Sequence, residues 1–438
     1  MVDGVDQAAR SARVAQFDAE VEGNLRRNMV ANFAHGMLGM TGFRIIYAPT
    51  LIPAYLHLIS GSTVIVGLGQ ALLQIGLLST PLASAAALEH RKRILPAAMR
   101  YGSAMRGAVL GLALSGYFLG GWWLVGATLL FLMLLGLFNG MQRVAFQMVI
   151  AKLIPADRRG RLQGWRNLAG GIVAAILSFA AGKWLIDANA FGNGYATTFL
   201  FAFLLTSMGL LALGLWAREP DAPVVREQVG LRQRMRDIPS LLADRDYRWF
   251  MAAQLLAMAG RIAAPFYILI ATGIGRDGNG AGALTLDGAT IGLLSLAFLG
   301  ADTLSNPVWG SIGDKRGYRG TIIASLAFTL AGIALLARAD AAWMVVAAFA
   351  AFGIGGAGFS LSTQTIVLEF GEREDLPMRI ALSTMVEGGV AALTPLIGGA
   401  VLLWAGSGTL LATAAVLTSS AALLMIVKVR DPRALKRL

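Results

Sequence analysis

The sequence of 438 residues contains no cysteine and three histidines, and only 14% of its residues are charged. The absence of cysteine excludes disulfides and metal sites held by thiolates. The sequence also lacks a His-Glu-x-x-His pair, a Gly-x-Ser-x-Gly motif and a Gly-x4-Gly-Lys-[Ser/Thr] phosphate loop. We therefore expect a protein that is not an enzyme and that uses no metal, no cofactor and no ATP.

The chain contains many long apolar stretches with few charged residues. Hydrophobic residues make up 56% of the chain, and its mean hydropathy is +0.64. A membrane-spanning helix needs ~20 mostly apolar residues, and about twelve such stretches occur, centred near residues 41, 76, 108, 136, 174, 207, 260, 300, 329, 355, 391 and 418. These runs are too long for the short alternating strands of a barrel. The sequence therefore predicts an all-α membrane protein with twelve transmembrane helices.

Basic residues are distributed unevenly between the predicted loops. Of the 37 Lys and Arg residues, only Lys183, Arg276 and Arg338 fall in the loops that we place outside. Most of the others lie in the alternate loops and near both ends of the chain, which is the positive-inside pattern. The net charge of +12 thus reflects topology, and we expect no nucleic-acid partner. This pattern predicts a multi-pass protein of the bacterial inner membrane with both termini in the cytoplasm.

The chain also repeats itself. Three pairs of segments match at nearly the same offset, and they begin at Arg161 and Arg379, at Arg44 and Arg261, and at Ser62 and Asp287. Ser62 and Asp287 are both good helix N-caps after an outside loop. These matches predict two pseudo-symmetric halves of six helices, inserted with the same orientation.

The repeat and the polar stretches divide the chain. We expect a cytoplasmic tail (1–27), a six-helix bundle (28–217), a cytoplasmic linker (218–247), a second six-helix bundle (248–428) and a second cytoplasmic tail (429–438). Residues 1–27 are polar with mixed charge and no apolar core, so we interpret them as a tail and not as a cleavable signal.

A short cationic stretch separates two apolar runs at residues 310–320, which read Gly-Ser-Ile-Gly-Asp-Lys-Arg-Gly-Tyr-Arg-Gly. Gly317 and Gly320 allow backbone angles that a bulky residue resists. Asp314 can cap the next helix or pair with a basic neighbour. The form G-x3-D-[KR]-x-G-x-[KR] resembles the loop signature of the major facilitator superfamily of transporters. The resemblance implies a gating loop formed by Gly310, Asp314, Lys315, Arg316, Gly317 and Arg319.

This resemblance extends over nearly the whole chain, from about residue 24 to 428. It implies the fold of that superfamily, in which two halves rock about a central site and expose it alternately. It also implies that spans one, four, seven and ten line the cavity, and that spans eight and eleven lie between the halves. The fifth span lacks the Gly-Pro motif typical of the family's drug/proton antiporters, and we assign no subfamily.

Polar residues within the spans follow helical stripes. Asn139, Gln142, Arg143, Phe146 and Gln147 lie at offsets of 0, 3, 4, 7 and 8 residues, which places them on one face of the fourth span. A polar stripe in a lipid-embedded helix must face protein or water. The alternative is that such groups hold helices together.

Similar stripes occur on the seventh span, at Gln254, Met258, Arg261 and Pro265, and on the tenth, at Ser360 and Gln364 with Gly353. A charge at membrane depth is costly and persists where it faces a cavity or a partner. The predicted substrate-binding residues are Arg44, Asn139, Gln142, Arg143, Gln147, Gln254, Arg261 and Gln364.

Two acidic residues are placed deep in the spans, Asp302 in the eighth and Glu387 in the eleventh. Each is either a proton carrier or the structural partner of a cavity arginine, and the two roles are compatible. His35 in the first span is a further candidate for proton transfer.

These observations predict a monomeric secondary transporter that moves a small organic anion or amphipathic acid in symport with protons. Arginine suits the carboxylate or phosphate of such a substrate. The alternatives are a multidrug or xenobiotic exporter of the same superfamily and, in a different class, a membrane sensor that does not transport.

Overall fold

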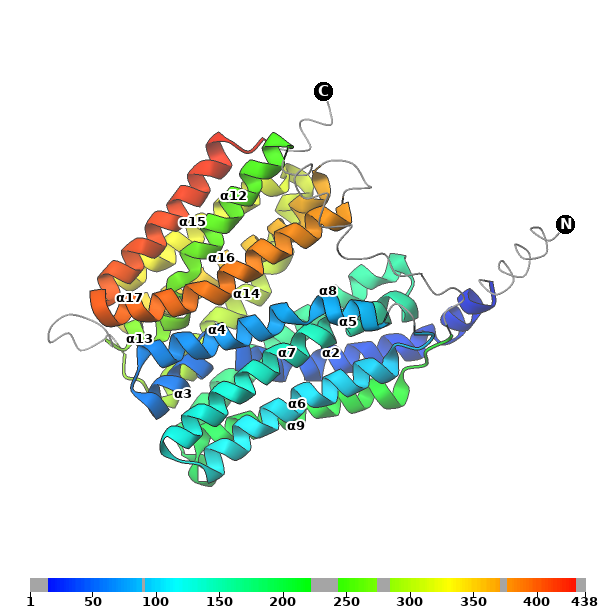
Figure 1. Cartoon of the computed structure of the whole chain (residues 1–438), viewed down its shortest axis with the longest axis horizontal. Coiled ribbons are helices and arrows are strands. Elements are labelled where there is room, and N and C mark those ends of the chain that lie inside the picture. Colours follow the sequence, from blue (N-terminus) through cyan, green and yellow to red (C-terminus); the bar gives the residue numbers. More distant parts are fainter. Residues whose placement is uncertain (1–14, 89–90, 222–242, 274–283, 371–375, 431–438) are drawn as a thin grey trace.

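The computed structural model describes residues 15–88, 91–221, 243–273, 284–370 and 376–430, which are helical apart from short connections (Figure 1). The helices of the N-terminal half are α2 (Leu25–Tyr47), α3 (Leu51–Ser60), α4 (Thr63–Ser79), α5 (Pro81–Leu88), α6 (Leu95–Phe118), α7 (Gly121–Leu153), α8 (Ala156–Ala181), the π-helix η1 (Gly182–Ile186), the 3-10 turn η2 (Ala190–Gly192) and α9 (Gly194–Trp216). Those of the C-terminal half are α12 (Arg245–Ala259), the 3-10 helix η3 (Gly260–Phe266), α13 (Tyr267–Ala271), α14 (Gly288–Arg316), α15 (Tyr318–Ala337), α16 (Ala342–Ile366), the 3-10 turn η4 (Val367–Glu369) and α17 (Leu376–Val427).

Within these residues, nine helical stretches are long and apolar enough to cross a membrane. The last of them, Leu382–Val427, is 46 residues long, about twice the length of one span, and Gly406 breaks it with a φ of 77°. Helices α2 and α6 have spanning length and carry more polar side chains. If the last stretch counts as two spans and α2 and α6 are added, the described helices are consistent with the twelve spans predicted from the sequence.

The two halves have the same internal packing. In the N-terminal half, α2 packs against α8 and α9, α6 against α7 and α9, and α4 against α7. In the C-terminal half, α12 packs against α17, α15 against α16 and α17, and α14 against α16. The equivalent helices thus have equivalent neighbours, as the sequence repeat predicts. Ser62 and Asp287 both cap helices, by accepting from the main-chain N–H of Ile65 and Thr290.

The first span of each half is broken close to an arginine. Helix α2 ends three residues after Arg44, and the chain continues after a short kink as α3. In the equivalent span, α12 passes into the 3-10 helix η3, which contains Arg261 and Pro265. Proline removes a helical hydrogen bond and disrupts the turn before it. A break of this kind exposes backbone groups, and in transporters it marks a binding region.

Tryptophans mark the two ends of the molecule. Those at the end opposite the termini are Trp122, Trp123, Trp184, Trp343 and Trp404, and all five are exposed. At the other end lie Trp216 and Trp249. Such aromatic belts lie at the boundary between lipid and water. The two belts therefore place the helices across a bilayer, as expected of a multi-pass membrane protein.

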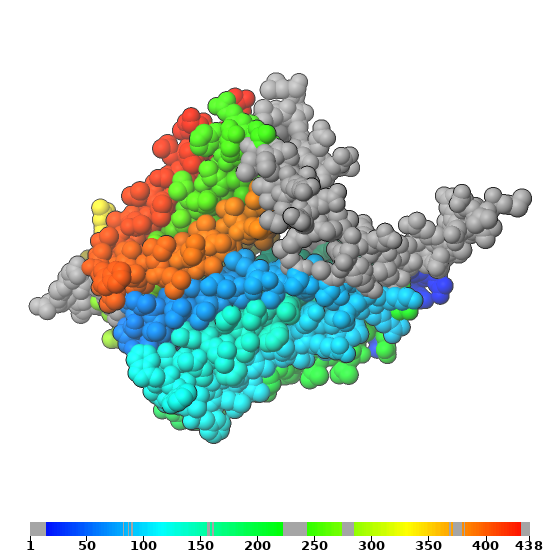
Figure 2. All heavy atoms as spheres, in the orientation of Figure 1, coloured from blue at the N-terminus to red at the C-terminus, as the bar shows by residue number. Residues whose placement is uncertain are grey.

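The halves meet at the end opposite the termini, around α3, α4 and α13, and diverge toward the end that carries the termini (Figure 1). Helix α4 packs against α17, and α8 packs against α14. On the face that Figure 2 shows, α4 and α17 are in direct contact. This agrees with the predicted position of spans eight and eleven between the halves.

Small residues allow this close approach. A Cβ at Gly67 would collide with the carbonyl oxygen of Pro395, and Thr63 Oγ1 donates to the carbonyl of Gly399 at 3.2 Å. The Pro-x-x-Gly-Gly sequence of the eleventh span is therefore the surface on which α4 crosses α17.

An acidic residue also joins the two halves at this end. Asp187, which follows η1, accepts hydrogen bonds from the main-chain N–H groups of Gly288 and Ala289 at the start of α14. A carboxylate at a helix N-terminus is stabilised by the helix dipole and by charge-assisted hydrogen bonds. This contact therefore stabilises the closed arrangement of this end.

We predict that Asp187→Asn favours opening of this end. Loss of ~1–2 kcal/mol at a helix N-terminus would raise the population of the open state by roughly five- to thirtyfold. The chain has no cysteine, so a single cysteine at Gln70, which lines a cavity close to this end, can report opening through its labelling rate. Labelling by a membrane-impermeant maleimide should accelerate in Asp187→Asn and stay unchanged in Asp340→Asn, an exposed acid at the same end. Equal rates in the two variants would refute this role of Asp187.

The cationic stretch at residues 310–320 contains a turn of only one residue. Helix α14 continues through Arg316, so Gly310 and Asp314 are helical, and Gly317 alone makes the turn with a φ of 87°. Gly320 lies within α15 without positive φ, so the expectation of special backbone angles there was wrong. Most of the predicted linker (218–247) and parts of both predicted tails lie outside the described residues.

Candidate functional site

Three adjoining cavities lie within the molecule. The outer cavity, of about 470 Å³, lies between the halves toward the closed end. The central cavity, of about 580 Å³, shares Gln74, Met258 and Arg261 with it and extends toward the end with the termini. The arginine cavity, of about 720 Å³, lies mainly in the N-terminal half and shares Arg143 and Gln147 with the central cavity. The three cavities therefore adjoin one another along the space between the halves and into the N-terminal half.

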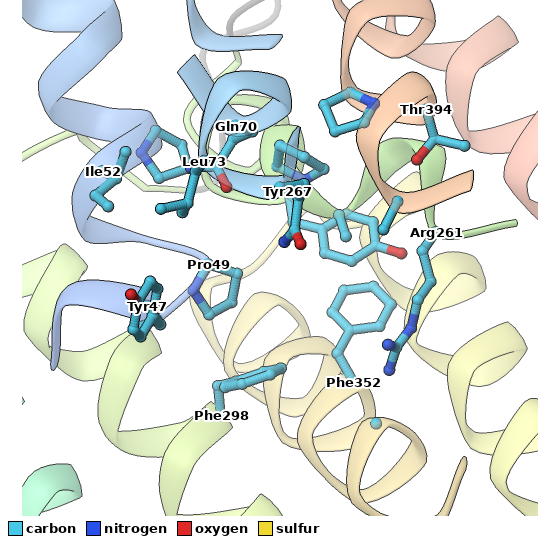
Figure 3. Close-up of a pocket in the computed structure, with 18 of the residues that line it drawn as sticks. Tyr47, Pro49, Ile52, Gln70, Leu73, Arg261, Tyr267, Phe298, Phe352 and Thr394 are labelled. Atoms are coloured by element: carbon cyan, nitrogen blue, oxygen red, sulfur yellow. The ribbon is translucent and has the colours of Figure 1, made fainter. Parts of the chain in front are cut away.

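Aromatic side chains surround the outer cavity, as Figure 3 shows. Tyr267 and Phe352 stack with their ring centroids 3.8 Å apart, and Arg261 lies beside them. Phe298 and Tyr47 form the opposite part of the wall. This cavity offers an apolar surface with one cation at its edge.

The central cavity is more polar, because both halves contribute amide and hydroxyl groups to it. Ser383 Oγ donates to Gln254 Oε1 at 2.9 Å, and Gln364 Nε2 donates to Ser360 Oγ at 3.1 Å. Arg143 enters the wall from α7 and Arg261 from η3.

Each of the eight predicted substrate-binding residues lines at least one of the three cavities. The stripe on α7 faces the arginine cavity with all five of its members, including Phe146. On α16, Ser360 and Gln364 reach the central cavity, but Gly353 does not, because it packs against Phe298 and Asp302 of α14. The structure thus brings the predicted residues together, and their role in binding stays a prediction.

Arg44 and Asp302 connect the two halves. The Arg44 guanidinium lies 3.5 Å from the Asp302 carboxylate and donates to Thr303 Oγ1 at 2.9 Å. Of the two roles considered for Asp302, the geometry matches the structural partner of a cavity arginine. Both side chains are about one-fifth exposed, so the pair is not sealed from water. An ion pair between moving halves can also break during a conformational change.

Glu387 differs from Asp302, since it lines the central cavity. It lies beside Gly388, where a Cβ would collide with Leu78 of α4. Glu387 therefore lies at the point where α17 and the N-terminal half begin to separate. His35 lines the arginine cavity, with its ring 4.8 Å from that of Phe146.

Sequence reasoning missed two buried arginines, Arg106 and Arg166, which had been counted with the basic residues of the cytoplasmic face. Each side chain is 3% exposed, and both line the arginine cavity. Arg106 lies eleven residues inside α6. At ~1.5 Å per residue this is about 16 Å from the helix end, so counting residues from the helix start would have found it.

The predicted gating loop lies at the open end. Asp314 accepts a hydrogen bond of 2.7 Å from the Tyr318 hydroxyl, and no side chain caps α15. Arg319 donates to the carbonyls of Met425 and Ile426 in the last turns of α17. Lys315 and Arg316 are exposed. In this arrangement the described contacts of the loop lie within its own half.

We predict that Asp314→Asn reduces transport at least about tenfold while substrate binding survives. The prediction assumes that the carboxylate stabilises the state in which this end is closed, and a charge-assisted contact contributes ~1.5–3 kcal/mol. Tyr318→Phe is the matched control, because it removes the neighbouring hydroxyl and keeps the charge. Initial uptake rate and equilibrium binding should be measured on the same preparations. Loss of binding with normal exchange between conformations would contradict the gating role.

Comparisons with known proteins agree with this architecture. The model of the Major Facilitator Superfamily matches residues 262–438. A mutant of the nucleoside transporter NupG is similar in structure, with a TM-score of 0.71 and 12% identity over 92% of this chain and 99% of that chain. A D-xylose–proton symporter has a TM-score of 0.69 and 13% identity, over 94% of this chain and 99% of that chain.

A bacterial homologue of the iron transporter ferroportin, in an inward-facing state, has a TM-score of 0.64 and 14% identity over 92% of this chain and 98% of that chain. None of the curated proteins matches this sequence. At these identities, the structural likeness shows a common fold over almost the full length.

Proposed function

We propose that this chain is a secondary transporter of the major facilitator superfamily, whose model matches residues 262–438 and whose transporters share its fold, and that it moves a small organic anion or amphipathic acid across the bacterial inner membrane. Transport proceeds by alternating access and is coupled to protons in symport. The family match and the fold indicate a transporter and not an enzyme.

One observation carries the choice of substrate. The cavity walls contain Arg44, Arg106, Arg143, Arg159, Arg166 and Arg261. Among the described residues that line the three cavities, Glu387 is the one acid. Buried charge of one sign is costly unless it is compensated. An anionic ligand compensates it, and the planar guanidinium fits carboxylate or phosphate with two parallel hydrogen bonds.

The transport cycle follows from the packing of the halves. We place the termini in the cytoplasm, so the arrangement described above exposes the cavities to the cytoplasm and closes the outer end. Rocking of the halves would break the contacts of Asp187 and the Arg44–Asp302 pair and would bring the loop at Gly317 against the N-terminal half. The halves would rock when Glu387 is protonated and the substrate is bound, or when both are absent, and not with only one of the two in place. This requirement couples the two movements in symport.

Uptake by reconstituted vesicles tests the proposal. Purified full-length protein should accumulate an organic anion such as benzoate against its gradient when an inward proton gradient is imposed, and a protonophore should abolish the accumulation. Failure of every tested mono- and dianion to bind or exchange would refute an anion carrier. If the protonophore does not affect accumulation, proton coupling is refuted, and the transport of anions is not.

The outer cavity favours a second candidate function, export of drug-like compounds. Its aromatic wall around Tyr267, Phe298 and Phe352 suits an apolar ligand. Inside-out vesicles should then accumulate a neutral or cationic dye when acidified within. We rank this function second because the arginines repel such cations and because the fifth span lacks the antiporter motif.

A further inference from the structure

Four residues of the N-terminal half lie at one depth. His35, Arg106 and Arg166 each lie ten or eleven residues after the start of their helices, and Arg143 lies ten residues before the end of α7. At ~1.5 Å per residue, all four are about 15 Å from the helix ends on the side of the termini. Since all four also line the arginine cavity, they form one layer around it.

A glycine of α2 makes room for one of these guanidinium groups, and a second glycine lies beside the other. A Cβ at Gly36 would collide with Arg166 Nε, and a Cβ at Gly39 would lie 3.7 Å from Arg106 Nη2 and 3.6 Å from His35 Cε1. Gly36 and Gly39 are one turn apart, so Arg166 and Arg106 lie against the same part of α2.

Neither arginine has a carboxylate partner among the described residues. Arg106 donates to the main-chain carbonyls of Thr206 and Gly102, and Arg166 donates to Gln163 Oε1 at 3.0 Å. In the cavity wall, Arg166 Nε, His35 Nδ1 and Gln142 Oε1 are buried with no hydrogen-bond partner. Two buried cations with spare donors and no described counter-ion need an anion to compensate their charge.

Two members of this layer have no charged or histidine counterpart in the C-terminal half. In the alignment of the repeats, Arg166 falls on Thr384, and at the offset that joins Arg44 to Arg261, His35 falls on Ala252. The second half forms the same bundle with other residues at these two positions, so the fold does not require Arg166 and His35 there. This asymmetry indicates a ligand that the N-terminal half holds.

We propose that Arg106, Arg143 and Arg166 bind a doubly charged oxyanion, either a phosphate monoester or a dicarboxylate, attached to an apolar or aromatic body. Two of these guanidinium groups are buried and the third lies in the open part of the cavity. Together they carry three positive charges, which a ligand with a single negative charge does not balance. The Arg106 guanidinium lies 5.4 Å from the ring centroid of Phe43, and that of Arg166 lies 4.9 Å from Phe146. These rings hold the guanidinium planes and offer the ligand body an apolar surface.

This inference rests on the proposed transport of anions and names the class of substrate. Its test measures the affinity of purified full-length protein for three probes with the same ring, namely phenyl phosphate, phthalate and benzoate. A dianion should bind at least about tenfold more tightly than benzoate, because each added charge-assisted contact contributes a factor of roughly ten or more. Comparison of phenyl phosphate with phthalate separates the phosphate from the dicarboxylate.

Arg166→Gln should remove the preference for the dianion and leave the affinity for benzoate within a few fold. Arg106 donates hydrogen bonds to main-chain carbonyls, so its substitution can prevent folding. The second variant is therefore Arg143→Gln, in the exposed part of the wall. Arg338→Gln, an exposed arginine at the opposite end, is the control that keeps the preference. Thermal unfolding of each variant verifies that it is folded.

The outcomes separate this inference from the proposed function. If benzoate binds as tightly as both dianions, or if Arg166→Gln and Arg143→Gln both keep the preference, the dianion site is refuted and the anion carrier stands. If none of the three probes binds, the anion carrier falls, and the dianion site falls with it.

Discussion

Arg261→Ala should weaken binding of an anionic substrate at least about thirtyfold. Truncation of one partner of a desolvated charged contact costs ~2–5 kcal/mol, and each 1.4 kcal/mol is a factor of ten. Arg261 is the one arginine that lines both the outer and the central cavity within the described residues, and η3 holds it at the break in its span. Arg143→Ala should have an effect of the same size, since Arg143 faces the central and the arginine cavities.

Lysine is the informative substitution at both positions. Lys keeps the charge and loses the planar two-pronged contact, so Arg261→Lys and Arg143→Lys should recover only part of the lost affinity. Arg338→Ala removes an exposed arginine at the outer end and should leave affinity unchanged. Equilibrium binding of a radiolabelled anion to purified protein checks all five variants. If both alanine variants bind as tightly as the parent, the two arginines are structural and the anion hypothesis is wrong.

Glu387→Gln should abolish gradient-driven accumulation and leave exchange of substrate across the membrane intact. A proton-coupled carrier needs a group whose protonation differs between its two states. Glu387 lies in the central cavity, next to the contact of Gly388 with Leu78 of the other half. Separation and closure of the halves there would change its access to water, and burial favours the neutral carboxyl. Glutamine imitates the neutral form permanently, so the variant can still exchange substrate but cannot release a proton.

Asp302→Asn is the matched comparison, because Asp302 is the other acid placed deep in the spans. It pairs with Arg44 across the halves and lines none of the three cavities. Its amide variant should change the rate of exchange, since the ion pair stabilises one arrangement of the halves. Counterflow and proton-driven uptake in vesicles separate the two effects. If both variants concentrate substrate with unchanged pH dependence, neither carboxylate carries the coupling proton.

Local sequence patterns were sufficient to predict the helices of this fold. A run of ~20 apolar residues spans a bilayer wherever it occurs, so hydropathy predicted the spans. Short-range hydrogen bonds made Ser62 and Asp287 helix caps, and helical periodicity placed the stripe on α7 toward a cavity. The glycine expected at the tight turn is Gly317, because its φ of 87° suits a residue without a Cβ.

Tertiary structure decided which side chains meet. Arg44 and Asp302 are separated by 258 residues along the chain, and no local signal indicates that they form a pair. Arg106 and Arg166 resemble the loop arginines of the positive-inside pattern until α2, with Gly36 and Gly39, packs against them. Sequence by itself determined the spans, the repeat and the excess of arginine, since these follow from composition and periodicity. The position of that charge in one cavity of one half depends on contacts between distant helices, which only the folded chain makes.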